Sequence, residues 1–207
     1  MKGYLSICRL LIAALALFGV TGSVIGHVYR HEFNSVFELF AQFTYVSNFV
    51  VAMILIFVAL GKLEDRHIII PLPSIVLTYI VFSLFLSEGI LREDIYSVIE
   101  HYVIALYLMF DFIFFVNGKN TFFRSLIFAV SIVVLYLIYV FVYGYLTNGY
   151  YPYFFFDLKT KSVESVMEVV FYINLTLVVL FIIFFALKFV QIALYERFNI
   201  SFFSQKH

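Results

Sequence analysis

Six long apolar runs, each bounded by charged or turn-forming residues, divide this chain of 207 residues. The runs extend over residues 4–26, 37–60, 69–86, 96–116, 122–146 and 166–195. A helix needs about 20 predominantly apolar residues to cross the hydrocarbon core of a bilayer, and each run approaches or exceeds that length. We therefore expect an all-α, polytopic membrane protein in which six transmembrane helices form a single domain over residues 1–207.

The composition agrees with this class and leaves no length for a sizeable soluble domain. Hydrophobic residues make up 64% of the chain and charged residues only 13%, whereas soluble domains carry about 25% charged residues. The formal net charge is zero, which gives no electrostatic reason to expect nucleic acid as a partner. We expect an integral membrane location with the lipid bilayer as partner, which in a bacterial cell means the plasma membrane.

The sequence predicts neither a metal nor any other cofactor. Cys8 is the only cysteine, so the chain offers it no second thiol for a disulfide, a redox pair or a metal cluster. His27 and His31, between the first and second runs, lack the spacing and the acidic neighbours of a metal site.

Lysine and arginine residues predict which side of the membrane each connection occupies. Those at the N-terminus, after the second and fourth runs and at the C-terminal end are Lys2, Arg9, Lys62, Arg66, Lys119, Arg124, Lys188, Arg197 and Lys206. Those on the other side are Arg30, Arg92, Lys159 and Lys161. Because cytoplasmic segments carry the excess of basic residues, we expect both termini in the cytoplasm. The first run continues to Ile25 without an Ala-x-Ala cleavage site, so we expect it to be retained as a helix.

Three small polar residues interrupt the second apolar run. Thr44, Ser47 and Asn48 stand at positions i, i+3 and i+4, so they share one face of a helix. With the predicted topology, Thr44 lies roughly 10 Å below the outer boundary of the membrane, and His101 in the fourth run lies about 8 Å below the same boundary. The shared depth makes these residues a candidate site.

A threonine and a histidine at one depth favour acyl or ester hydrolysis. A threonine hydroxyl needs a base within hydrogen-bond reach to act as a nucleophile, and histidine is the usual base at neutral pH. We expect Thr44 to be the nucleophile and His101 the general base, with a ring nitrogen and the hydroxyl within about 4 Å. Ser47 and Asn48 are expected to donate to the developing oxyanion or to hold a water. The expected substrate is a membrane lipid or fatty acid ester.

Two other interpretations stay open. Small polar residues in membrane helices commonly serve helix packing and interhelical hydrogen bonds, and a histidine can lock its helix to a neighbour. Alternatively, the chain is a small multi-pass transporter or ligand-binding membrane protein, in which Thr44, Asn48, His101 and Asp111 line a polar path.

The connection between the fifth and sixth runs is rich in aromatic residues. Tyr151, Pro152 and Tyr153 lie in it on the predicted outer side, where they are expected to cover the site. Asp157 in the same connection is a candidate to orient His101, and an exposed loop acid is the alternative.

Asp111 is too far along the fourth run to orient His101. It follows the histidine by ten residues, which is about 15 Å along a straight helix. We expect Asp111 to pair instead with Arg9 or Arg124 near the inner boundary.

Three short motifs in this chain resemble those of one family, the androgen-induced and androgen-dependent membrane proteins of animals and their bacterial six-helix relatives. The motifs are Phe43-Thr44 followed by Ser47-Asn48, His101-Tyr102 followed by Asp111, and Tyr151-Pro152-Tyr153 followed by Asp157. The resemblance covers most of the chain in length and topology, and its specific part is these motifs.

The resemblance implies a function and two catalytic residues. Animal members of the family are threonine hydrolases that cleave fatty acid esters of hydroxy fatty acids within the membrane. The family's threonine corresponds to Thr44 and its histidine to His101. The chain departs from many bacterial relatives at Ala105, near which a proline would be expected. The departure loosens the match in the fourth run without changing the proposed chemistry.

Overall fold

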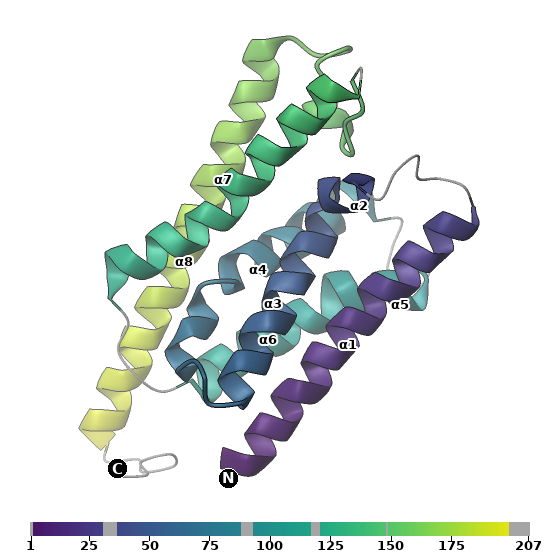
Figure 1. Ribbon diagram of the computed structural model, residues 1–207. Coiled ribbons are helices and arrows are strands. Elements are labelled where there is room, and N and C mark those ends of the chain that lie inside the picture. The colour runs from purple at the N-terminus through teal and green to yellow at the C-terminus, as the bar shows by residue number, and fades with distance from the viewer. Residues whose placement is uncertain (1, 31–36, 88–92, 117–120, 148, 199–207) are drawn as a thin grey trace.

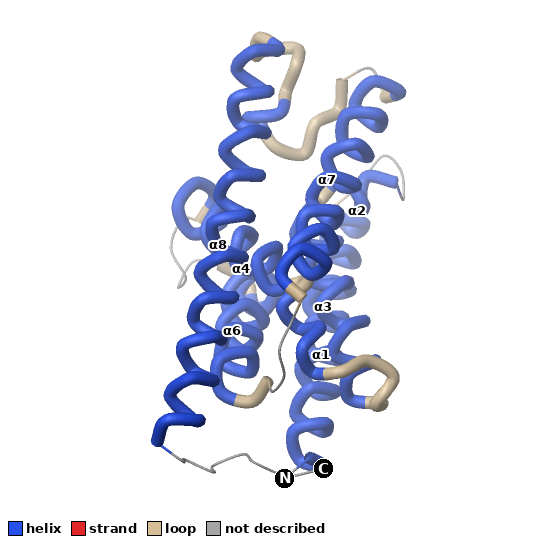
Figure 2. The backbone as a smooth tube through the Cα atoms, turned by 90° about the vertical axis from the view of Figure 1, so that its left-hand side faces the viewer, coloured by secondary structure: helices blue, strands red, loops and turns tan. Residues whose placement is uncertain are grey.

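The computed structural model describes residues 2–30, 37–87, 93–116, 121–147 and 149–198, and all regular structure in these ranges is helical (Figure 2). Four residues of the sequence analysis lie outside the described residues: His31, Arg92, Lys119 and Lys206. Within the described ranges, five helical segments are long and apolar enough to cross a membrane. They are Gly3–Tyr29, Asp65–Leu86, Ile95–Phe114, Phe122–Leu146 and Val163–Leu194. The chain is therefore an all-helical protein of the multi-pass membrane class.

Three of the helices are continuous: α1 (Lys2–Tyr29), α7 (Phe122–Leu146) and α8 (Val163–Phe198). Two other segments change helix type along their length. One comprises η1 (Asp65–Ile69), α4 (Leu72–Val81) and the π-helical η2 (Phe82–Leu86). The other comprises α5 (Ile95–Val98), the π-helical η3 (Ile99–Val103) and α6 (Ile104–Phe114). A short 3-10 helix, η4 (Phe154–Phe156), lies between α7 and α8.

The second apolar run, expected as one span over residues 37–60, is broken. It forms α2 (Phe37–Ala41) and the 17-residue α3 (Phe43–Ala59), separated by Gln42 in an extended conformation. The break leaves backbone groups without helical partners, and tyrosine hydroxyls bind two of them. The Tyr136 hydroxyl donates to the Ala41 carbonyl at 2.8 Å, and the Phe43 amide donates to the Tyr153 hydroxyl at 3.2 Å. These partners come from distant parts of the chain, so the apolar character of residues 37–60 does not by itself predict the break.

α4 lies inside the bundle, where it contacts α3, α6, α7 and α8 (Figure 1). Every residue from Leu72 to Thr78 is buried. Pro71 precedes the first residue of α4, as expected for a residue that lacks a backbone N–H and suits a helix start.

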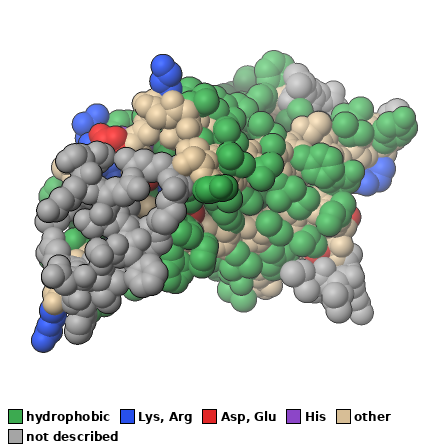
Figure 3. All heavy atoms as spheres, turned by 90° about the horizontal axis from the view of Figure 1, so that it is seen from below, with side chains coloured by type: hydrophobic (Ala, Val, Ile, Leu, Met, Phe, Trp, Pro, Cys, Tyr) green, Lys and Arg blue, Asp and Glu red, His purple; other side chains and the backbone are tan. Residues whose placement is uncertain are grey.

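The outer surface of the bundle is largely apolar. Hydrophobic side chains cover most of the described face shown in Figure 3. Phe123, Leu135 and Phe171 are each more than half exposed. Such surfaces suit lipid, which is as apolar as these side chains.

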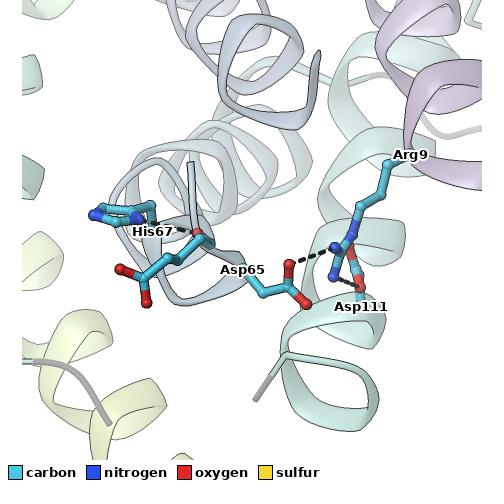
Figure 4. A network of polar contacts seen from close by, with 5 residues as sticks. Arg9, Asp65, His67 and Asp111 are labelled. Carbon is cyan, nitrogen blue, oxygen red and sulfur yellow. Dashed lines mark hydrogen bonds and ion pairs between the residues drawn. The ribbon is translucent and has the colours of Figure 1, made fainter. Parts of the chain in front are cut away.

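An ionic cluster joins α1, η1 and α6. Arg9 donates two hydrogen bonds to the Asp111 carboxylate, at 2.8 and 2.9 Å, and pairs with Asp65 at 3.1 Å (Figure 4). Arg9 and Asp111 are both buried. The prediction that Asp111 pairs with Arg9 or Arg124 is confirmed, and Arg9 is the partner. A bidentate pair of this kind fixes the geometry between two helices as well as their distance.

Candidate active site

Thr44 and His101 meet in the interior of the bundle. Thr44 is the second residue of α3 and His101 is the central residue of η3. Thr44 Oγ1 and His101 Nε2 lie 3.1 Å apart, and each residue is only 8% exposed. The distance is a hydrogen-bond distance and falls within the 4 Å expected from the sequence.

The second ring nitrogen of His101 determines which way this hydrogen bond runs. His101 Nδ1 lies 2.9 Å from the Ser97 carbonyl, one helical turn earlier. A carbonyl only accepts hydrogen bonds, so Nδ1 carries the proton that this contact requires. In a neutral imidazole Nε2 is then the acceptor, and the Thr44 hydroxyl donates to it. The hydroxyl is therefore placed to lose its proton to the ring.

Both π-helical segments contribute to the position of the histidine. Phe82, the first residue of η2, stacks on His101 of η3 with ring centroids 3.5 Å apart and an angle of 14° between the planes. Tyr102 contacts the Phe82 ring edge-on, and its hydroxyl donates to Ser87 at 3.2 Å. Single π-helical turns within α-helices occur frequently at functional sites, and here two of them face each other.

Asp157 does not orient His101, which corrects that prediction. Its carboxylate accepts hydrogen bonds from the Lys159 amide and the Thr160 hydroxyl, both at 2.9 Å. Asp157 thus closes a local turn in its own connection, as short acidic side chains commonly do. The Ser97 carbonyl occupies the position that the carboxylate was expected to take.

Ser47 and Asn48 hold the backbone around Thr44 instead of facing the substrate. Ser47 Oγ donates to the Thr44 carbonyl at 3.1 Å and contacts the Thr78 hydroxyl at 3.1 Å. Asn48 Nδ2 donates to the Thr44 carbonyl at 2.9 Å and to the Glu100 carbonyl at 3.1 Å. These donors are already engaged, so the expectation that they stabilise an oxyanion is wrong for this arrangement. Asn48 instead ties α3 to η3, and so ties Thr44 to His101.

A cavity of about 40 Å³ lies beside the Thr44–His101 pair. Apart from these two residues, its polar lining consists of Thr78, Tyr136 and Tyr153, and the remainder is apolar or aromatic. Tyr153 contacts the Thr44 side chain and accepts from the Phe43 amide. Burial raises the pKa of the Tyr153 phenol, so its hydroxyl keeps its proton at neutral pH.

The other two residues of the Tyr-Pro-Tyr motif lie outside this cavity. Tyr151 packs over Gly144 of α7, where a Cβ atom would approach the tyrosine ring to 2.4 Å. Pro152 is half-buried in the connection and does not line the cavity. Phe155 and Phe156 do line it, so the connection covers the site through Tyr153 and two phenylalanines.

The contributors that the sequence analysis does not identify include Phe82, Ser97, Thr78 and Tyr136. A phenylalanine among 28 gives no signal, and neither does a backbone carbonyl. Thr78 has a weak signal in the sequence. Ser74 and Thr78 stand at i and i+4 in an apolar run, so they share a helix face.

Among the described residues, no group of three or more histidine, cysteine, aspartate and glutamate side chains is arranged to hold a metal ion. Comparison of the chain with protein-family models, with curated proteins and with solved structures gives no match. The fold defines the class of protein, an integral multi-pass membrane protein, and the function has to be argued from the site itself.

Proposed function

We propose that this protein is a membrane-embedded hydrolase of fatty acyl esters, with Thr44 as nucleophile and His101 as general base. The observation that carries the proposal is the 3.1 Å contact between Thr44 Oγ1 and His101 Nε2, combined with the Nδ1 contact to the Ser97 carbonyl. A nucleophile, a base and a group that orients the base are the three parts of a catalytic triad. The same chemistry is implied by the resemblance to the androgen-induced membrane protein family.

The reaction proceeds through an acyl-threonine. The Thr44 proton passes to His101 Nε2 as Oγ1 bonds to the ester carbonyl carbon. Collapse of the tetrahedral intermediate breaks the bond to the alcohol oxygen, and the alcohol leaves with the proton held on Nε2. A water then attacks the acyl-threonine and gives its proton to Nε2. Release of the fatty acid returns that proton to Thr44 Oγ1.

The donor for the oxyanion in this scheme is the Tyr153 hydroxyl. Its oxygen accepts from the Phe43 amide, and its proton would turn from the Thr44 side chain to the substrate as the tetrahedral intermediate forms. Donors aimed at the position of the developing charge contribute a large share of the rate in acyl transfer.

The cavity limits which part of a substrate is enclosed. A volume of about 40 Å³ is only a few times the 10–15 Å³ or so that one water requires on this measure. The ester group and the carbons next to it fit, whereas a long acyl chain exceeds this space. We propose that the rest of the substrate's acyl chain lies along the apolar surface of the protein that faces lipid.

A transporter is the alternative function, and the apolar core between Thr44 and Asp111 argues against it. A polar path would have to connect Thr44 with Asp111. On α3 and α6 the intervening Val51, Leu55 and Leu108 are fully buried in one apolar cluster. A solute flux into proteoliposomes that required His101 but no ester substrate would favour the transporter over the hydrolase.

We also propose that α2 and α3 together supply a sixth span and that both termini face the cytoplasm. At 1.5 Å per residue, residues 37–59 extend over roughly 35 Å, enough to cross a bilayer. The asymmetry of basic residues supports the orientation. Reporter fusions at the two termini check it, and a periplasmic or extracellular signal at either end would contradict it.

Hydrolysis by the purified protein tests the proposed function. We expect Thr44→Ala and His101→Ala each to lower the rate of fatty acyl ester cleavage by about 10³-fold or more. Thr44→Ser keeps a hydroxyl and retains measurable activity. Labelling by an acyl-directed probe should be lost in Thr44→Ala.

The matched control is Thr147→Ala, because this exposed threonine lies at the end of α7, away from the cavity lining. It should leave both readouts unchanged. Full labelling of a correctly folded Thr44→Ala protein would exclude Thr44 as the nucleophile.

A further inference from the structure

A second and larger cavity lies at the other end of α4. Its volume is about 370 Å³, and its described lining comes from α3, the segment around η1 and the first turns of α7. Ile70, just before α4, lines this cavity, whereas Leu77 and Thr78 in the last turns of α4 line the cavity beside Thr44. The two cavities share no described lining residue.

Every titratable side chain among the described residues that line this cavity is basic: Arg66, His67 and Arg124. Two acids, Glu64 and Asp65, neighbour these residues in the chain, and neither lines the cavity. Glu64 pairs with Arg66 at 2.7 Å and its own side chain is 67% exposed. Asp65 is turned toward Arg9, while His67 lies on the other side of η1 (Figure 4). Glu64 offsets part of the charge of Arg66, so the positive character of the cavity comes mainly from Arg124, and no carboxylate lies among the described lining residues.

The start of α7 adds hydrogen-bond donors to this charge. Thr121, the residue before the first of α7, lines the cavity and makes no capping hydrogen bond with its side chain. Ser125 also lines it and is only 8% exposed. Its hydroxyl can donate a hydrogen bond to an anion bound in the cavity.

The rest of the lining is apolar and continues onto the surface that faces lipid. Ile54, Leu63, Ile70 and Phe128 line the cavity, and Phe128 is 49% exposed. Ile127, next to Phe128, is 64% exposed. A free inorganic anion has no use for an apolar wall, whereas a lipid presents an anionic headgroup and acyl chains together. The predicted topology places this end at the cytoplasmic boundary, where basic pockets between helices bind anionic headgroups.

We propose that this cavity binds the phosphate group of an anionic membrane phospholipid, with Arg124 and the Ser125 hydroxyl as its principal contacts and Arg66 and His67 at its edge. Arginine suits this task because its planar fork binds phosphate oxygens in pairs. The lipid would hold η1 against the start of α7. The site is independent of the proposed hydrolysis, because it uses none of the residues that surround Thr44.

Thermal unfolding of the full-length protein in detergent tests the proposal. The probes are short-chain phosphatidylglycerol and, separately, inorganic phosphate. We expect phosphatidylglycerol to raise the unfolding midpoint in a saturable way. Arg124→Gln and Ser125→Ala should each weaken its apparent affinity, by about tenfold or more for the arginine, as expected for loss of a charge-assisted hydrogen bond.

Lys62→Gln is the matched control for charge. Lys62 is exposed, lies close to Arg66 in the chain and does not line the cavity, so its loss changes the net charge equally. An affinity that falls equally in Lys62→Gln and Arg124→Gln would overturn the proposal, because it would indicate general electrostatic attraction. Stabilisation by inorganic phosphate that phosphatidylglycerol does not match would overturn the lipid as occupant. An unchanged affinity in both Arg124→Gln and Ser125→Ala would exclude the site.

Discussion

At the scale of single residues, a backbone carbonyl does for His101 what an acidic side chain does in many hydrolases. The Ser97 carbonyl holds the proton on Nδ1 and leaves Nε2 toward Thr44. A carbonyl in a helix is fixed in position by the helix itself. It also brings no net charge into a buried site, where an unpaired carboxylate would be expensive.

Tyr153→Phe separates the oxyanion donor from the rest of the site. The phenylalanine keeps the aromatic packing but removes the hydroxyl proposed to stabilise the tetrahedral intermediate. We expect kcat to fall by about 10²-fold or more, with a much smaller effect on KM. Steady-state kinetics with a soluble acyl ester give both values.

Tyr151→Phe is the control, since Tyr151 belongs to the same motif but packs over Gly144. Equal losses of kcat in the two variants would show that Tyr153 acts through packing of the connection and not through its proton.

At the scale of helices, the site is built where helices depart from the regular α-form. Thr44 follows the break at Gln42, Phe82 begins η2 and His101 lies in η3. In a continuous α-helix over residues 37–60, the backbone groups beside Thr44 would bond within the helix and would not bind side chains from other segments. The break instead brings the Tyr136 and Tyr153 hydroxyls to the same few residues.

Tyr136→Phe tests whether the break depends on its tyrosine partners. The Ala41 carbonyl would lose a hydrogen bond from a residue that is only 6% exposed. An unsatisfied buried group costs about 1–3 kcal/mol, so the free energy of unfolding in detergent should fall by that amount. The measurement is denaturant-induced unfolding followed by far-UV circular dichroism.

Tyr145→Phe is the control, because it makes the same chemical change in the same helix at a position that is 84% exposed. It should leave the free energy of unfolding unchanged. A stable Tyr136→Phe protein with unaltered hydrolysis would mean that the break persists without this bond.

How much of the site the sequence predicts depends on the kind of interaction. Thr44 and His101 were paired correctly because depth follows from the rise per residue. The partners of Asp157, Ser47 and Asn48 were not predicted. Each of these side chains is bound by a group within a few residues or on a neighbouring helix, and the choice depends on helix rotation and local backbone geometry.

At the scale of the whole molecule, polar groups gather toward the two ends of an apolar core. The Thr44–His101 pair and the Arg9–Asp111 pair are separated by fully buried residues such as Leu55. The ionic pair joins α1 to α6, and α6 continues directly from η3, which carries His101. The Arg9–Asp111 pair therefore supports the Thr44–His101 site through the shared helical segment.

Asp111→Leu should destabilise the whole bundle. Arg9, which is 2% exposed, would keep Asp65 as its one ionic partner among the described residues. Removing one member of a buried pair typically costs about 3–5 kcal/mol, whereas replacing both with apolar residues is often neutral. The double variant Arg9→Met with Asp111→Leu should therefore recover much of the loss. Thermal unfolding of the three proteins in one detergent measures this, and an additive double variant would contradict the coupling.

The sequence by itself determined the class of this protein, the approximate ends of its helices and the common depth of Thr44 and His101. These properties follow from the apolar interior of the bilayer and from the regular rise of a helix, which act on each segment separately. Only the tertiary structure decided the break at Gln42, the π-helical turns, the carbonyl that orients the histidine and the tyrosine at the cavity. Those features depend on which groups from distant segments satisfy one another's hydrogen bonds, and the pattern of apolar residues along the chain does not encode that choice.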